Sequence, residues 1–232
     1  MNKRKLTIIG FTLLGLGVFL SLGTWQVLRA QLKNQQLDQY ALSVAQPPVR
    51  VTQGSQLVRG THVTLTGTLT GQQTLLLQNQ SWQKQQGYRV WQPLRTSWGM
   101  TVMVDLGWIP PQQRHLIDTQ NQSLTLTGVL HTLPLPGMRA GHTPCPASRW
   151  PYPVYYPNLA DLQCYHQTSQ MYDGVLLLDQ HASNQLYKRD WQGLFTPMPA
   201  STHYGYAMTW YSFALISLFL GGLFWRGSSR SP

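Results

Sequence analysis

The run from His203 through Tyr206 to Trp210 contains the residue types that point most directly to chemistry. A neutral imidazole can ligate a haem iron, and aromatic rings can cover the faces of the macrocycle. His203 also stands at the threshold of an apolar run, where His and Tyr commonly anchor a membrane–water interface. From the residues alone, iron ligation and interface anchoring both remain open.

Two cysteines and two histidines form a second group with possible chemistry. Cys145 and Cys164 enclose 18 residues, and His142 and His166 lie close to them in the sequence. Outside the cytoplasm, a disulfide between the cysteines would stabilise the fold by about 3 kcal/mol. Free thiols are an alternative, as is a copper or zinc site built from all four side chains, although the spacing is unusual for a metal site.

Arg29 and Lys33 follow the first apolar run of the chain. They could pair with an anionic ligand such as the propionates of a haem, or with lipid phosphates or a loop Asp. The signatures of common enzyme classes are missing: there is no Gly-x-Ser-x-Gly, no phosphate-binding loop, no Gly-x-Gly-x-x-Gly and no Cys-x-x-Cys. The chain has no Glu and its Asp residues are scattered singly, so a pair of catalytic carboxylates is not expected either.

Two apolar segments at the ends of the chain predict membrane-spanning helices. Leu6 to Leu22 is an uncharged run of 17 residues, about 26 Å long as a helix against a hydrocarbon core of about 30 Å. Ser21-Leu-Gly23 loosely resembles a signal-peptide cleavage site, but the run exceeds a usual signal sequence, so an uncleaved anchor is expected. The second run, Tyr206 to Trp225, is followed by Arg226 and Arg230.

The charge distribution predicts the orientation of these helices. The net charge is +10, and five of the basic residues lie in the two short tails without any acidic residue. By the positive-inside rule we expect both termini to be cytoplasmic and the central domain to lie on the other side of the membrane. That side is the periplasm for the inner membrane of a bacterium, which we expect here, and would be the intermembrane space in a mitochondrion. The expected segments are a cytoplasmic tail at 1–5, a transmembrane helix at 6–24, a periplasmic domain at 25–203, a second transmembrane helix at 204–225 and a cytoplasmic tail at 226–232. No basic stripe interleaved with aromatic residues occurs, which argues against nucleic-acid binding.

The polar middle of the chain predicts a β-rich domain. Helix 1 should continue over 24–42, until Pro47-Pro48 stops it. Alternating or short apolar patterns predict strands near 62–69, 75–77, 100–106, 124–130 and 175–178. The nearly identical segments 63–69 and 124–130 are either an internal repeat or, as we prefer, two antiparallel strands with a Gly bend or bulge. Residues 134–157 hold seven prolines and are expected to form an extended surface excursion, neither a helix nor an inner strand. The predicted fold class is an α+β membrane protein, in which two transmembrane helices flank a mostly antiparallel β domain, a small barrel or sandwich.

Four segments in the same order resemble motifs of the Surfeit locus protein 1 family of cytochrome c oxidase assembly proteins. They are Leu22-Gly-Thr-Trp25-Gln26-Val-Leu-Arg29, Gly87-Tyr-Arg-Val-Trp-Gln-Pro-Leu94, Val102-Met-Val-Asp-Leu-Gly107-Trp108-Ile-Pro110 and His203-Tyr-Gly-Tyr206-Ala-Met-Thr-Trp210. The resemblance covers nearly the whole chain. Leu106 stands where many members have Arg, and Ser201-Thr202 replace a frequent Asn pair.

The resemblance implies a non-catalytic assembly factor of the respiratory chain. Its client would be cytochrome c oxidase subunit I, and it would work with the haem a synthesis machinery in the lipid bilayer. It implies transient binding of haem a, with His203 as a tentative iron ligand and with Tyr206, Trp210, Trp25, Gln26 and Arg29 around the cofactor. Gly107 and Trp108 are expected to be structural residues in a turn. Two alternatives to this haem chaperone are a cofactor-free scaffold that stabilises subunit I and a periplasmic copper-handling module built on the two cysteines.

Overall fold

Residues 3–134, 145, 149–180, 186–189, 191 and 198–228 are described in the computed structural model of the chain. The chain divides into two units, one formed by Met1–Asp38 with Gln192–Pro232 and the other by Gln39–Trp191. The first unit consists of helices and the second is built mainly from strands.

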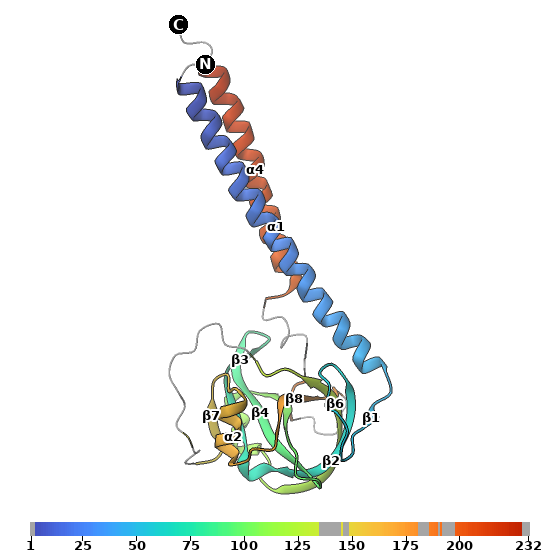
Figure 1. Ribbon diagram of the computed structural model, residues 1–232. Coiled ribbons are helices and arrows are strands. Elements are labelled where there is room, and N and C mark those ends of the chain that lie inside the picture. Colours follow the sequence, from blue (N-terminus) through green and yellow to red (C-terminus); the bar gives the residue numbers. More distant parts are fainter. Residues whose placement is uncertain are drawn as a thin grey trace. The chain divides into compact units, whose positions relative to one another are not determined.

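The first unit contains two long helices, α1 (Lys3–Ala45) and α4 (Ala200–Ser228) (Figure 1). The last turns of α1, after Asp38, belong to the second unit. The two helices run antiparallel, since Gly15 approaches Ser217 while Thr12 approaches Gly221. Among the described residues these are the two helices long and apolar enough to cross a membrane. The prediction of one such helix at each end of the chain is confirmed, and the exact span limits at 6–24 and 204–225 remain predictions.

Small residues line the contact between the two helices. Gly23 lies against the ring of Tyr211, where a Cβ atom would come within 2.5 Å of a ring carbon. Ala207 and Ala214 are buried, and their spacing of seven residues places them on one stripe of α4. Many large apolar side chains of α4 are instead exposed, as the 68% exposure of Leu215 illustrates. Close approach through small residues is typical of helix packing in lipid.

The second unit is an eight-stranded sheet, counted over the described residues. Its strands are β1 (Val49–Arg50), β2 (His62–Thr70), β3 (Leu75–Trp82), β4 (Gln85–Thr96), β5 (Thr101–Ile109), β6 (Asn121–His131), β7 (Tyr152–Val154) and β8 (Met171–Leu178). The order is β1-β2-β6-β8-β5-β4-β3-β7. An additional pairing of β2 with β4 closes β2, β6, β8, β5 and β4 into a ring, and these five strands form a small barrel (Figure 1). Within this ring β5–β8 is parallel and the other pairings are antiparallel. The predicted fold class, including its mostly antiparallel β domain, is confirmed.

The two nearly identical segments pair with each other in the ring. Leu65 of β2 lies opposite Leu126 of β6, so the preferred prediction of two antiparallel strands is confirmed. The pairing continues through the segment without a register shift, which excludes a bulge between these two strands. The glycines instead allow close approach: a Cβ on Gly67 would meet the carbonyl oxygen of Arg95 in β4, and one on Gly128 would meet that of Leu177 in β8. Gly67 therefore leaves room for β4 beside β2, and Gly128 leaves room for β8 beside β6.

The alternating apolar residues fill the interior of the ring. Leu65, Leu94, Val104, Leu130 and Leu176 are completely buried and belong to one core cluster. Because side chains alternate between the two faces of a strand, the period-two pattern predicts Leu65, Val104 and Leu130. Leu94 lies in β4, a strand that this pattern did not predict.

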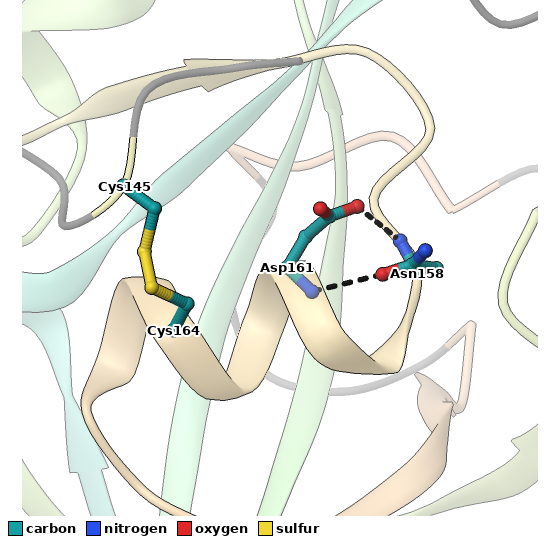
Figure 2. Close-up of a disulfide and its surroundings, with 4 residues drawn as sticks. All are labelled: Cys145, Asn158, Asp161 and Cys164. Carbon is teal, nitrogen blue, oxygen red and sulfur yellow. Dashed lines mark hydrogen bonds between the residues drawn. A yellow bond between two sulfur atoms is a disulfide. The ribbon is translucent and has the colours of Figure 1, made fainter.

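The proline-rich stretch differs in part from the prediction. Its described portion contains β7, an edge strand that pairs in parallel with β3, and Tyr152 and Val154 of β7 are buried. A wholly superficial path is therefore wrong for β7, although it is not an inner strand. The part of the prediction at 135–144 and 146–148 lies outside the described residues. After the stretch comes a helix that was not predicted, α2 (Leu159–His166), which begins with a capping box between Asn158 and Asp161 (Figure 2).

Candidate functional site

His203 and Gln26, which lie far apart in the sequence, meet in the helix pair. His203 lies in the first turn of α4, and its Nδ1 is 2.7 Å from Oε1 of Gln26 in α1. A carboxamide oxygen only accepts hydrogen bonds, so Nδ1 must be the donor. In the neutral ring, Nε2 then carries a lone pair and no hydrogen. Both side chains are half-buried.

Gln26 reaches His203 because its neighbours on α1 are small. Gly23 and Ala30 lie three residues before it and four after it, on the same side of the helix, and both are buried. With Tyr211 of α4 packed against Gly23, the backbones come close enough for a Gln side chain to span the gap. Tyr211 also lies 3.3 Å, hydroxyl to hydroxyl, from Thr24.

Trp25 and Arg29 form a separate pair on the exposed surface of α1. The guanidinium carbon of Arg29 is 5.7 Å from the centre of the Trp25 ring, a cation–π distance. Trp25 is rotated about 100° from Gln26 around the helix axis, because each residue of an α-helix turns by that angle. Both side chains remain exposed and leave an aromatic ring and a cation available.

Tyr206 and Trp210 share a face of α4 with His203 but have different surroundings. Tyr206 is exposed. Trp210 is half-buried and stacks on Phe19 of α1 at 6.0 Å with an interplanar angle of 20°. Phe213 completes this aromatic cluster. Trp210 therefore contributes to helix packing, a role that the sequence alone did not suggest.

The donor set of this helix pair fits a haem better than a bare metal ion. Among the described residues there is no group of three or more His, Cys, Asp or Glu side chains that could hold a metal. A haem brings four nitrogen ligands of its own and needs one imidazole from the protein. His203 supplies such an imidazole, Tyr206 and Trp25 offer ring surfaces, and Arg29 offers a cation for carboxylates.

The two cysteines form a disulfide, with their Cα atoms 6.1 Å apart (Figure 2). The sulfurs are therefore not thiolates, and a copper site at this place would require the bond to be reduced first. His142, which the copper hypothesis also needs, lies outside the described residues.

His166 is buried at the C-terminal end of α2, the helix that contains Cys164. Its ring stacks on that of Trp150, with 5.4 Å between the ring centres. Neither of its ring nitrogens has a hydrogen-bond partner among the described residues. Burial lowers the pKa of His166 to about 4, with a further contribution from the charge of Arg95. His166 is therefore neutral at physiological pH.

Gly107 and Trp108 lie within β5 and not in the turn that the sequence suggested. Gly107 has a φ of +122° next to a register shift between β4 and β5, a conformation that L side chains rarely adopt. The indole of Trp108 lies over Gly87, where a Cβ atom would collide with the ring, and its Nε1 donates to the carbonyl oxygen of Gln80. Both residues take part in the packing around β5, and a structural role for them remains a prediction.

A buried ion pair in the barrel was missed in the sequence. Nε of Arg89 donates to Oδ2 of Asp105 at 2.6 Å, and the backbone N–H of Gly107 donates to Oδ1 at 2.9 Å. The guanidinium also lies over the ring of Trp191 at 4.6 Å. Asp105 stands alone among apolar residues of its strand, which was the available signal, but an alternating pattern assigns such a residue to the solvent face.

The unusual Leu106 lines a cavity of about 250 Å³ in the β domain. Arg189 also lines this cavity, and its Nε donates to the carbonyl oxygen of Leu106 at 2.9 Å. Burial lowers the pKa of Arg189. An arginine is thus present beside position 106, but it comes from a different part of the chain.

Together, the elements define a class: an α+β protein with a ring-closed sheet and two apolar helices suited to membrane anchoring. The model of the SURF1 family, the same Surfeit locus protein 1 family that the four motifs resemble, matches residues 13–215. The chain belongs to the SURF1 family, and the predicted membership is confirmed. This family is linked to cytochrome c oxidase assembly and is not a known family of enzymes. A search of curated proteins found no match to the chain.

Proposed function

We propose that this protein is a membrane-anchored assembly factor that binds haem a through His203 and aids its insertion into subunit I of cytochrome c oxidase. The observation that carries the proposal is a half-buried imidazole whose Nδ1 donates to Gln26 and whose Nε2 is left with a lone pair. Family membership supplies the link to oxidase assembly.

Each residue around His203 has a distinct part in this proposal. His203 would ligate the iron, Tyr206 and Trp25 would pack on the macrocycle, and the cation of Arg29 would pair with a propionate. Trp210 holds the two helices together through Phe19. The bound haem supplies an iron centre and an apolar macrocycle, and the protein supplies its ligand and surroundings until the client takes it.

The helix pair provides a route for haem between protein and lipid. Because α1 and α4 are antiparallel, Lys3 and Ser228 lie at one end of the pair, and Gln26 and His203 lie well away from them along it. With the basic tails in the cytoplasm, His203 belongs to the periplasmic side of a bacterial inner membrane. A haem bound there would meet hydrocarbon with its macrocycle and water with its propionates.

Haem binding is tested with the full-length protein purified in detergent from cells that make haem a. The wild type should show a Soret band that His203→Ala reduces at least tenfold relative to protein. His115→Ala removes an exposed histidine in the short helix Pro111–Leu116 and should leave the band unchanged. Equal bands in the wild type and His203→Ala would exclude His203 as the ligand.

A cofactor-free scaffold for subunit I is the second candidate. Gly10 and Gly17 of α1 have nothing within 4 Å of an added Cβ among the described residues, and small residues let a further transmembrane helix approach closely. In this case His203→Ala would restore oxidase assembly to a deletion strain as well as the wild type does. Gly17→Leu would then lower assembly, whereas the haem proposal predicts the opposite pattern for the two variants.

A further inference from the structure

The bond between Gln26 and His203 decides which ring nitrogen of His203 can act as a ligand. A neutral imidazole carries one hydrogen, and the partner of one nitrogen determines where that hydrogen resides. Oε1 of Gln26 lies 2.7 Å from Nδ1 and can only accept. The hydrogen bond to Gln26 therefore favours the tautomer with hydrogen on Nδ1, a preference that His203 would not have by itself.

We propose that Gln26 is a positioning residue: it holds His203 in the Nδ1–H tautomer, fixes the ring orientation and so presents Nε2 to the haem iron. This inference rests on the proposed function for the identity of the ligand, but the tautomer itself is a property of the protein without cofactor. It changes the predicted role of Gln26 from a residue that touches haem to one that acts through His203.

Hydrogen bonding at Nδ1 also sets the strength of Nε2 as a donor. An acceptor that pulls the Nδ1 hydrogen increases the electron density of the ring, and such outer partners commonly change metal affinity 10–100-fold. A carboxylate is a stronger acceptor than an amide and favours ferric over ferrous iron. Gln26 is neutral, so it orients the ring with less electron donation than an Asp or Glu would give.

A neutral acceptor also suits the place where Gln26 lies. Its neighbour Gly23 is buried against Tyr211 of α4, Ala30 is also buried, and a carboxylate near hydrocarbon is costly. Moderate donation further suits a site from which a cofactor is handed on, because a weaker iron–imidazole bond breaks more readily.

The tautomer is tested first, without haem, on the full-length protein labelled with ¹⁵N-histidine in detergent micelles. The ¹⁵N shifts of His203, assigned by comparison with His203→Ala, should show hydrogen on Nδ1 in the wild type. In Gln26→Leu, which keeps similar volume but has no acceptor, the hydrogen should move to Nε2. Gln31→Leu, a change at an exposed glutamine of the same helix, should leave the signal unchanged. An Nε2–H tautomer in the wild type, or the same tautomer in Gln26→Leu, would overturn the proposal.

Haem titration then tests the consequence for the ligand. Gln26→Leu should weaken haem binding at least tenfold, and Gln31→Leu should not change it. The midpoint potential of the bound haem should follow the acceptor strength, lowest in Gln26→Glu, intermediate in the wild type and highest in Gln26→Leu. The iron–histidine stretching frequency in resonance Raman spectra of the ferrous protein should be highest in Gln26→Glu, intermediate in the wild type and lowest in Gln26→Leu.

The two proposals fail in different ways. If wild-type protein binds no haem, or if His203→Ala keeps it, the proposed function is wrong, while the ¹⁵N signals still decide the role of Gln26. If His203→Ala loses haem but the Gln26 variants match the wild type in affinity, potential and Raman frequency, the function stands and the positioning role is wrong. Gln26→Glu retains an acceptor, so its potential remains informative if Gln26→Leu fails to fold.

Discussion

The helix pair and the barrel sort their side chains in opposite ways. In the barrel large apolar residues fill the interior, and Leu65, Leu94 and Leu130 are fully buried. In the helix pair the buried residues are small, such as Ala207 and Ala214, and large residues such as Phe219 are mostly exposed. One chain therefore contains two structures built for two solvents.

The contrast follows from what drives burial in each solvent. In water, apolar area removed from solvent is worth about 25 cal/mol per Å², which favours large residues inside. In lipid that gain vanishes, and helices associate by close packing through small residues. The apolar exterior of the helix pair thus supports membrane anchoring more strongly than length and hydropathy do, because a helix in the core of a soluble protein would bury its large residues.

The largest effect is expected from the buried charges of the barrel. Arg89→Leu leaves Asp105 buried without its main partner, which should lower the free energy of unfolding by about 3–5 kcal/mol. Arg95→Leu, at an exposed position of the same strand, is the matched control and should cost less than about 1 kcal/mol. Urea unfolding followed by tryptophan fluorescence measures both, and equal losses would show that the ion pair is not a special feature of the barrel.

A pH titration gives the next largest effect, again in the β domain, at His166 of α2. The pKa of His166 is about 4 in the folded protein, against about 6.5 in an unfolded chain. Between these values only the unfolded chain binds the proton, so stability should fall as the pH is lowered from 6.5 to 4, by up to about 3 kcal/mol. His166→Phe should remove this part of the slope and His115→Gln should not. A slope unchanged in His166→Phe would contradict burial of a neutral His166.

Two glycines of α1 test whether the helix pair buries small residues and exposes large ones. Gly23→Leu should collide with Tyr211 and reduce stability by about 1–3 kcal/mol. Gly17→Leu adds the same side chain where nothing lies within 4 Å among the described residues, and in lipid it should be nearly neutral. Thermal unfolding in detergent measures the difference. If Gly17→Leu were the more harmful change to stability, the exposed face of α1 would not be a lipid-facing surface.

The smallest effect is expected at the surface of the β domain. Arg59 and Asp173 form an ion pair whose side chains are 53% and 56% exposed. Asp173→Asn should change the free energy of unfolding by less than about 1 kcal/mol, because water and salt screen the pair. A loss as large as that of Arg89→Leu would erase the distinction between buried and exposed charges on which the comparison depends.

The four family motifs illustrate how far sequence reasoning reaches. They were recognisable one by one, but the structure joins them into two contacts. Gly87 accommodates the indole of Trp108 in the barrel, and Gln26 bonds to His203 in the helix pair. No spacing rule predicts these contacts, because they depend on strand register and on how closely two helices approach.

The sequence by itself determined the apolar ends, the alternating strands and the candidate ligand His203, since these depend on local patterns of residue type. The tertiary structure alone decided that β2 pairs with both β6 and β4, that Asp105 faces Arg89 and not water, and that Trp210 packs helices. It also placed Nδ1 of His203 within hydrogen-bond distance of Gln26. These features arise between residues distant in the chain, where a contact must satisfy packing and hydrogen bonding at once, and a linear pattern carries no such information.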